Sequence, residues 1–235
     1  MSGETGGCQG IIQAVASLSE PSQCDPGLLT DAYAVEIRLD LMPDIPPARV
    51  DRLAGSFDGP IILTLRSVEE GGRFTGDEAA FIRATTPFLP YVTMVDVETR
   101  FQGDADRIRE MGITIISSCH TDRMLTRQEL ETLCHRLRGY GDIPKIAVRP
   151  QDTADLLTLL SFTHAAAKPI IVSVTGVVCR SARPLLPLFG SLFTYCYIGT
   201  PTSPGQYSLE EMKCLSALLS PVIMDTWFDP SPPHP

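Results

Sequence analysis

One lysine stands inside a short apolar segment, where a charged side chain is unusual. Lys145 is one of only three lysines in the chain, and Ile143, Ile146 and Val148 lie around it in GDIPKIAV, residues 141–148. Lysine is rarely buried, because a charge taken out of water must be paired or neutralised. Burial lowers the lysine pKa from about 10.4 towards roughly 7–8, where the neutral amine attacks carbonyl carbons to form imines. The segment therefore predicts that Lys145 is the nucleophile of an imine-forming enzyme.

An imine-forming lysine needs a base close to it, and the preceding apolar segment ends in a histidine. His120 can take a proton from the carbon next to an imine and return it to a leaving group near neutral pH. A carboxylate would hold the tautomer of the ring, with Glu70 as the first candidate and Asp96 as the second. Glu36, Asp96 and His120 could instead converge on a divalent metal in a lyase or aldolase, but the chain has no HxH or HExxH spacing. A divalent-metal lyase or aldolase stays open as an alternative.

Arginines at the ends of apolar segments suit the binding of an anionic substrate. Arg180 follows the apolar run at 168–175 and is the first candidate to clamp a carboxylate through two parallel hydrogen bonds; Arg183 is the second. Glu36 and Arg38 share one side of an earlier segment with Asp40. These three residues are interpreted either as part of the site or as a structural ion network, and the sequence leaves both open.

Two loops have the composition of segments that border a binding site. Residues 67–76, SVEEGGRFTG, are rich in glycine, and residues 199–207, GTPTSPGQY, are suited to tight turns. The second loop also offers hydrogen-bonding side chains from Thr202, Ser203 and Gln206. Loops carry function when a rigid scaffold aims them at a site. We expect both loops to lie at the active face, where 67–76 could act as a lid.

The segments that carry these residues alternate with helical patterns. Thr126 with Glu129 forms a capping box, and Asp152 and Ser208 are candidate helix N-caps. Between the helical patterns lie eight apolar runs typical of parallel strands, at residues 10–15, 33–41, 60–66, 91–98, 113–120, 143–148, 168–175 and 192–198. The pattern predicts an α/β protein with one domain, a (β/α)8 TIM barrel whose functional residues gather at the C-terminal ends of the strands. A doubly wound open sheet is the alternative, but no GxGxxG follows the first run.

Composition limits the class of protein and its partners. The chain of 235 residues carries a net charge of −9, which argues against nucleic acid or an anionic membrane as a partner. Seven cysteines without a CxxC pair are typical of a reducing compartment. No signal peptide or membrane-length apolar run is evident, so we expect a cytoplasmic protein. We expect a flexible N-terminus at 1–9, a catalytic barrel at 10–222 and a tail or linker at 223–235.

The ordered motifs EIRLD, TLRSVEEGG, VDVE, SCH, KIAV, GVVCR, FGSLFTY and SPGQ resemble the type I 3-dehydroquinate dehydratases. The resemblance implies a (β/α)8 barrel, a homodimer, no cofactor, and syn elimination of water from 3-dehydroquinate to give 3-dehydroshikimate. Two positions depart from the family pattern, since Cys179 and Thr202 stand where serine is usual. The family also occurs fused to shikimate dehydrogenase, so fusion to that enzyme or association with it is a possible arrangement.

The resemblance also implies a role for each candidate residue. Lys145 would form the imine, His120 would take the C2 proton and assist departure of the C1 hydroxyl, and Glu70 would orient His120. The substrate would be held by Glu36, Arg38, Arg66, Arg180, Thr202, Ser203 and Gln206. Two alternatives stay open: an imine-forming class I aldolase or transaldolase, and a non-catalytic barrel that binds a cyclic carboxylate.

Overall fold

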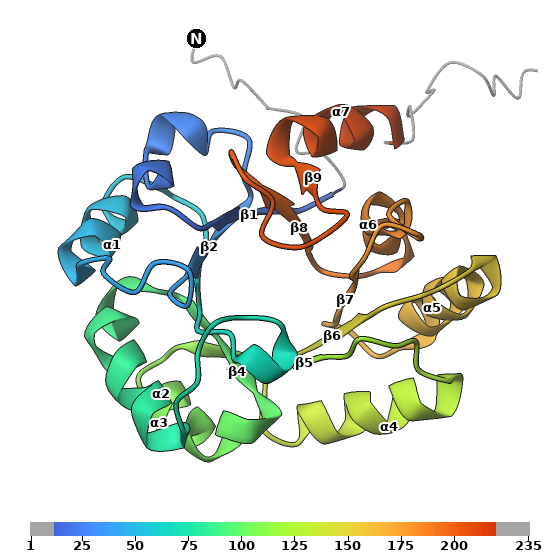
Figure 1. Cartoon of the computed structure of the whole chain (residues 1–235), viewed down its shortest axis with the longest axis horizontal. Coiled ribbons are helices and arrows are strands. Elements are labelled where there is room, and N and C mark those ends of the chain that lie inside the picture. Colours follow the sequence, from blue (N-terminus) through green and yellow to red (C-terminus); the bar gives the residue numbers. More distant parts are fainter. Residues whose placement is uncertain (1–11, 220–235) are drawn as a thin grey trace, which may run out of the picture.

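The computed structural model describes residues 12–219, which form a curled parallel sheet surrounded by helices (Figure 1). The eight predicted strands are all present, although the first begins later than the predicted run at 10–15. They are β1 (Ala14–Leu18), β2 (Ala34–Arg38), β3 (Ile61–Thr64), β4 (Met94–Glu98), β5 (Thr114–His120), β6 (Ile143–Val148), β7 (Ile171–Val174) and β8 (Thr194–Tyr197). A short ninth strand, β9 (Tyr207–Ser208), pairs with β8. The predicted (β/α)8 barrel in one domain is confirmed.

Helices cover the outside of the sheet. In the described residues a helix follows each strand from β2 to β8: α1 (Pro47–Ala54), α2 (Glu78–Thr85), α3 (Ala105–Arg109), α4 (Arg127–Arg138), α5 (Thr153–Ala165), α6 (Ala182–Leu185) and α7 (Leu209–Leu219). β1 is instead followed by two short 3-10 turns, Pro21–Gln23 and Pro26–Leu28. The first strand–helix unit therefore has no α-helix of its own.

The predicted helix starts are confirmed by their capping contacts. At α4, the Thr126 side chain accepts from the Glu129 backbone N–H while the Glu129 carboxylate accepts from the Thr126 backbone N–H. Asp152 accepts from the Asp155 backbone N–H at the start of α5. Ser208 and Glu211 make the reciprocal pair of bonds before α7. These side chains satisfy backbone donors that a helix cannot pair internally.

The barrel has a seam between its seventh and eighth strands. The hydrogen-bonded order of the described strands runs β7-β6-β5-β4-β3-β2-β1-β8-β9, so β7 and β8 do not pair with each other. Ser191 bridges the seam, because its Oγ accepts from the Val172 backbone N–H at 3.0 Å. Leu192 N–H also donates to the Ile170 carbonyl at 2.8 Å. The seam is thus joined by a side chain and one backbone bond instead of a strand ladder.

Inward-pointing side chains form two levels inside the barrel. The lower level is an apolar plug made of Val15, Ala34, Ile62, Ile116, Ile143, Ile171, Phe193 and Tyr195. Two residues further along the strands the same side turns polar, since Ser17 pairs in register with Glu36, and Ser118 with Lys145. Alternate residues of a barrel strand face the same way. The period of two therefore places a polar level directly above a packed floor.

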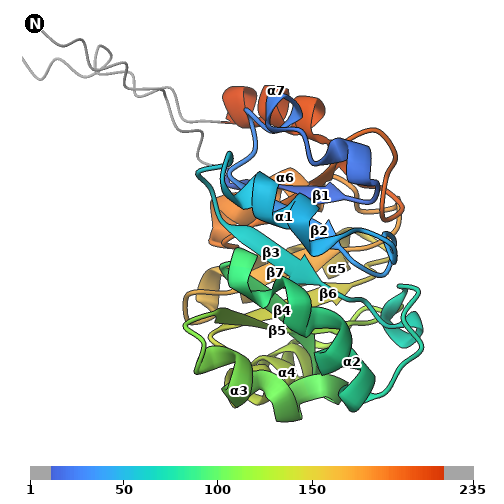
Figure 2. The same ribbon diagram turned by 90° about the vertical axis from the view of Figure 1, so that its left-hand side faces the viewer.

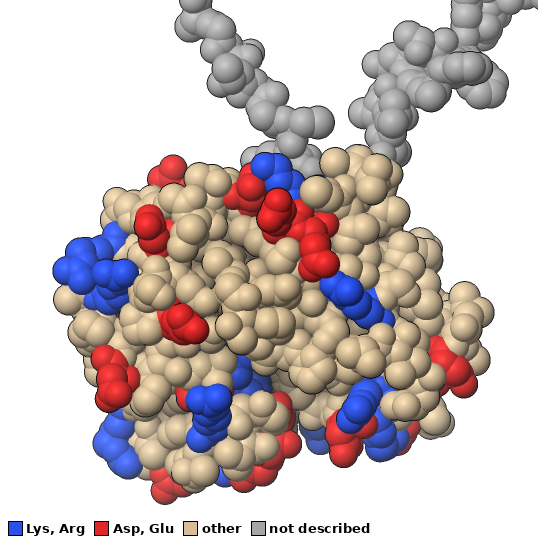
Figure 3. Space-filling view, turned by 45° about the horizontal axis from the view of Figure 1, so that its top comes forward, with Lys and Arg blue, Asp and Glu red and all other residues tan. Residues whose placement is uncertain are grey.

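The polar level opens toward the C-terminal ends of the strands. Figure 2 shows the loops after β3 and β8 on this side of the barrel. On the face seen in Figure 3, acidic and basic side chains are interspersed, and neither sign forms a broad patch. Among the described residues no helix is both long and apolar enough to cross a membrane. The predicted N-terminal segment 1–9 and tail 223–235 lie outside the described residues.

Candidate active site

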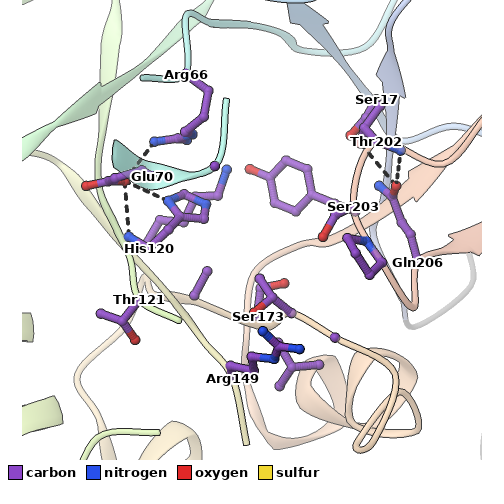
Figure 4. A pocket seen from close by; sticks show the side chains of 18 of the residues that line it. Ser17, Arg66, Glu70, His120, Thr121, Arg149, Ser173, Thr202, Ser203 and Gln206 are labelled. Carbon is purple, nitrogen blue, oxygen red and sulfur yellow. Dashed lines mark hydrogen bonds and ion pairs between the residues drawn. The ribbon is translucent and has the colours of Figure 1, made fainter. Parts of the chain in front are cut away.

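A cavity of about 440 Å³ lies above the polar level, between the loops that follow the strands. Nine of the ten predicted site residues line it: Lys145, His120, Glu70, Glu36, Arg38, Arg66, Thr202, Ser203 and Gln206. Arg180 does not line it, whereas Arg183 does. Figure 4 shows Arg66, Glu70 and His120 on one side of the cavity and Thr202 and Gln206 on the other.

Lys145 is buried on β6 but is paired with carboxylates. Its Nζ lies 2.8 Å from Asp96 Oδ2 and 3.7 Å from Glu36 Oε1. Burial on its own lowers the pKa of Lys145, but Asp96 first, then Tyr195 and Glu36, act in the opposite direction and raise it above its ordinary value. The prediction of a lowered lysine pKa is therefore wrong for this structure. The segment around Lys145 is apolar, but the carboxylates come from other strands.

His120 is held by Glu70, the first of the two predicted carboxylate partners. Its Nδ1 lies 2.9 Å from Glu70 Oε2, and the same oxygen accepts from the His120 backbone N–H at 3.1 Å. Because Oε2 already accepts a backbone hydrogen bond, we assign the ring proton to Nδ1, which leaves Nε2 unprotonated. Burial, and then the charges of Arg66 and Lys145, hold the pKa of His120 well below its ordinary value. His120 is thus a neutral ring with a free acceptor nitrogen.

Glu70 shares its environment with other carboxylates. Burial raises its pKa to about 8, with Glu98 and Asp96 adding to the shift and Arg66 opposing it. Asp96, the second predicted partner of His120, is instead occupied by Lys145 and by Arg66, whose Nη2 lies 2.8 Å from Asp96 Oδ1. Glu70 therefore contacts His120, whereas Asp96 contacts Lys145.

Arg66 joins these carboxylates into one network. Its Nη1 lies 3.1 Å from Glu70, 2.9 Å from Glu98 and 3.0 Å from Ser118 Oγ. Glu98 is fixed in turn by Ser67, whose hydroxyl donates to it at 2.5 Å. The prediction that Arg66 binds substrate hydroxyls is not tested by these contacts. They show that Arg66 contacts Glu70, the carboxylate that contacts His120.

The structure supports both interpretations of Glu36, Arg38 and Asp40, as a structural ion network and as part of the site. Arg38 makes two parallel bonds to Asp40, of 2.9 and 2.8 Å, which is the expected structural ion pair. Glu36 accepts from the hydroxyls of Ser17 at 2.6 Å and Thr64 at 2.9 Å. Glu36 and Arg38 nevertheless line the cavity. The ion pair and the hydroxyl bonds fix two side chains that a substrate can reach.

The two predicted arginines after β7 lie in different places. Arg180 lies outside the cavity, where its Nη2 is 3.1 Å from Glu211 and its Cζ is 3.7 Å from the centre of the Tyr207 ring. Arg183 on α6 is buried and lines the cavity, and its Nε has no hydrogen-bond partner. Burial lowers the pKa of Arg183 to about 10. Of the two predicted candidates for a carboxylate clamp, Arg183 is therefore the one that lines the cavity in this structure.

The loop after β8 presents a buried amide to the cavity. Gln206 Oε1 accepts from the Thr202 backbone N–H at 2.9 Å and from the Thr202 hydroxyl at 3.0 Å. With the oxygen occupied, the Nε2 hydrogens of Gln206 are the part of the amide left to donate. Gly205 has a φ of +77°, and a Cβ there would lie 2.1 Å from the Gly176 carbonyl oxygen. Glycine is needed here because the loop packs closely against the segment after β7.

The loop at 67–76 has internal structure of its own. The Val68 N–H donates to the Phe74 carbonyl at 3.0 Å, and the Gly72 N–H donates to the Ser67 carbonyl at 2.7 Å. Glu69 on this loop forms an ion pair with Arg100 beyond β4. The loop borders the cavity, and its predicted role as a lid stays a prediction.

Tyr195 and Arg149 are among the cavity-lining residues that sequence reasoning missed. Arg149 directly follows β6 and continues the alternation of Lys145 and Ala147, so the period of two was an available signal. Tyr195 lies on β8 in register with Val15, an inward residue of β1. Among the described residues no group of three or more His, Cys, Asp or Glu side chains is arranged to hold a metal ion.

Comparison with known proteins identifies the family. The family described as Type I 3-dehydroquinase matches residues 23–220. The 3-dehydroquinate dehydratase of Methanospirillum hungatei is 46% identical over 222 residues, covering 94% of this chain and 87% of that protein. The Methanoregula boonei enzyme of the same name is 42% identical over 209 residues, with 89% and 100% covered.

A solved structure shares the fold. The crystal structure of 3-dehydroquinate dehydratase from Geobacillus kaustophilus superposes with a TM-score of 0.80 at 23% identity, covering 88% of this chain and 91% of that one. The family match spans most of the barrel, and the curated relatives are similar over nearly their whole length. The chain therefore belongs to the type I 3-dehydroquinase family.

Proposed function

We propose that this chain removes water from 3-dehydroquinate by syn elimination, through an imine on Lys145, and releases 3-dehydroshikimate. One observation carries the proposal. The Lys145 amine and the Glu70-held ring of His120 line one cavity that also contains the buried cation of Arg183. The cavity thus combines a nucleophile, a base and an anion-binding group.

Imine formation needs no proton from outside the lysine. In the resting site the ammonium of Lys145 donates to Asp96 at 2.8 Å, so Asp96 is the group placed to accept its first proton. The freed amine adds to the ketone carbon as the carbonyl π pair moves to oxygen. That oxygen leaves as water with two hydrogens that were on Nζ, and one hydrogen stays on the imine nitrogen. The step is balanced because an ammonium and a ketone give a protonated imine and water.

His120 then carries out the elimination. Its unprotonated Nε2 takes the C2 proton, and the electron pair of the broken C–H bond moves toward the imine nitrogen. The resulting enamine expels the C1 hydroxyl, which leaves as water with the proton that His120 returns. Glu70 stabilises the ring while it is charged. Hydrolysis of the imine releases the product and restores Lys145.

Substrate binding divides between the two sides of the cavity. We assign the carboxylate to Arg183 and the Gln206 amide, with Thr202 and Ser203 beside them, because Arg183 is a buried guanidinium that lines the cavity on the same side as the loop after β8. Glu36 and Arg38 are assigned to the ring hydroxyls. Arg66 is assigned to positioning Glu70. We also predict that the protein is cytoplasmic and forms a homodimer, and that it is fused to shikimate dehydrogenase or associates with it.

Borohydride reduction with 3-dehydroquinate tests the chemistry directly. We expect a covalent adduct on the peptide that contains Lys145, and its loss together with turnover in Lys145→Ala. Lys213→Ala is the matched control, since Lys213 is exposed and pairs with Asp31. An adduct on another residue, or normal turnover by Lys145→Ala, would contradict the mechanism. Release of an aldehyde from a sugar phosphate would identify an aldolase instead.

A further inference from the structure

Tyr195 is a buried phenol at the centre of the site that the proposed chemistry leaves unused. It lies on β8, is 6% exposed and lines the cavity. The Nζ of Lys145 lies 4.0 Å from the centre of its ring. The Tyr195 ring therefore borders the atom that must bond to the substrate.

The hydroxyl of Tyr195 donates no hydrogen bond within the described residues, and the neighbouring Lys145 ammonium can only donate to it. The other fully buried hydroxyls that line the cavity, within the described residues, are those of Ser17 and Thr64, and both already donate to Glu36. A buried polar group without a partner is costly, and native proteins keep few of them. The Tyr195 hydrogen is therefore available to a bound molecule.

The charged side chains that contact Nζ accept hydrogen bonds and cannot donate them. Asp96 and Glu36 are carboxylates, at 2.8 and 3.7 Å. The ring nitrogen that His120 leaves free, Nε2, is also an acceptor. When Nζ adds to a ketone, negative charge develops on the ketone oxygen, and these acceptors do not stabilise it. That oxygen needs a donor close to Nζ.

We propose that the Tyr195 hydroxyl donates a hydrogen bond to the substrate's ketone oxygen while Lys145 adds to the ketone carbon. This inference rests on the proposed function. The carbon must come within bonding distance of Nζ, so its oxygen is held among the atoms that surround Nζ, where Tyr195 lies. Burial raises the pKa of Tyr195, so the phenol stays protonated and able to donate. Tyr195 keeps its proton throughout, because both hydrogens of the departing water come from Nζ.

Tyr195→Phe tests the proposal, because it keeps the ring and removes only the hydroxyl. Tyr197→Phe is the matched control: Tyr197 lies on the same strand and does not line the cavity. The measurement is the rate at which the borohydride-trapped Lys145 adduct accumulates in a single turnover with saturating 3-dehydroquinate. We expect Tyr195→Phe to slow trapping by about 10- to 100-fold. Tyr197→Phe should stay within about twofold of the wild type.

A second replacement separates the hydroxyl from the shape of the ring. Placing 3-fluorotyrosine at position 195 retains the hydroxyl and should bring trapping back to within about threefold of the wild-type rate. Trapping by Tyr195→Phe at the wild-type rate would overturn the inference, and so would a 3-fluorotyrosine variant as slow as Tyr195→Phe. Absence of a Lys145 adduct in the wild type would instead refute the proposed function, so the two failures are distinguishable.

Discussion

Replacing Arg183 by methionine should weaken substrate binding and stabilise the free protein at the same time. Arg183 is buried and its Nε lacks a partner. Burial lowers its pKa from an ordinary value of 12.5 to about 10, which corresponds to a destabilisation of about 3 kcal/mol in the folded protein. The sign follows from linkage: the guanidinium is charged in both states at neutral pH, so the full penalty is present below pH 10 and fades above it.

Methionine is neutral and of similar length, so Arg183→Met should raise the free energy of unfolding by about 1–3 kcal/mol at neutral pH. Under the proposed function, the same change removes the charge-assisted hydrogen bonds from Arg183 to the substrate carboxylate. Losing one partner of such a buried pair costs about 2–5 kcal/mol. A loss of about 3 kcal/mol raises KM for 3-dehydroquinate about 100-fold, because each 1.4 kcal/mol is a factor of ten.

Arg180→Met is the matched control, three residues away. Arg180 pairs with Glu211 at the surface, and such exposed pairs contribute less than about 1 kcal/mol. It should therefore lower stability slightly and leave KM within about twofold. KM is measured from ultraviolet absorbance of the conjugated enone in the product, and stability from urea unfolding without substrate. A larger rise in KM for Arg180→Met than for Arg183→Met would refute the assignment of the substrate carboxylate to Arg183. An Arg183→Met protein that is less stable and has an unchanged KM would refute both the assignment and the cost of burying Arg183.

Two further predictions concern the His120 partner and a helix cap. Because the pKa of Glu70 is raised to about 8, kcat/KM should rise with pH through an inflection near 8 that belongs to the coupled Glu70–His120 pair. In Glu70→Gln this inflection should vanish and kcat/KM should fall about 10- to 100-fold; an unchanged pH profile would contradict the assignment. Asp152→Ala removes the N-cap of α5 and should lower the free energy of unfolding by about 1 kcal/mol in urea, with kcat and KM unchanged.

The period of two along the strands was enough to find most of the site. Lys145, Glu36 and His120 could be predicted to converge because alternation within a strand is local, and because parallel strands in a barrel end on one face. The capping contacts of α4 and α5 are local as well, so their starts were predicted correctly. Both the fold and the location of the cavity could therefore be predicted from local sequence patterns.

The charges around Lys145 were not predictable in the same way. By strand register Asp96 lies level with Ile116, and Ile116 with Ile143, so its backbone is two residues below Lys145. Asp96 reaches Nζ only because of how the strands tilt and how the side chains extend, which the pattern of one strand does not show. The lysine pKa was therefore predicted from its own segment alone, and its sign was wrong.

The sequence did not show which of Arg180 and Arg183 lines the cavity. α6 has only four residues, so no helical period in the sequence shows which arginine turns inward. Arg180 was the first candidate and Arg183 the second, and the family motif GVVCR also points to Arg180. Only the path of the chain between β7 and α6 brings Arg183 into the cavity.

The pairing of Lys145 with Asp96 has a consequence for the whole reaction. An ammonium and a protonated imine carry the same formal charge at nearly the same point. The carboxylates that keep the resting lysine protonated therefore also favour the protonated form of the imine, which is the form that withdraws electrons. Since Arg66 and Ser118 hold Asp96 before any substrate arrives, the electrostatic field that the intermediate requires is already built by folding. A lysine with a raised pKa is thus suited to this site, because the charge on its nitrogen need not change when the imine forms.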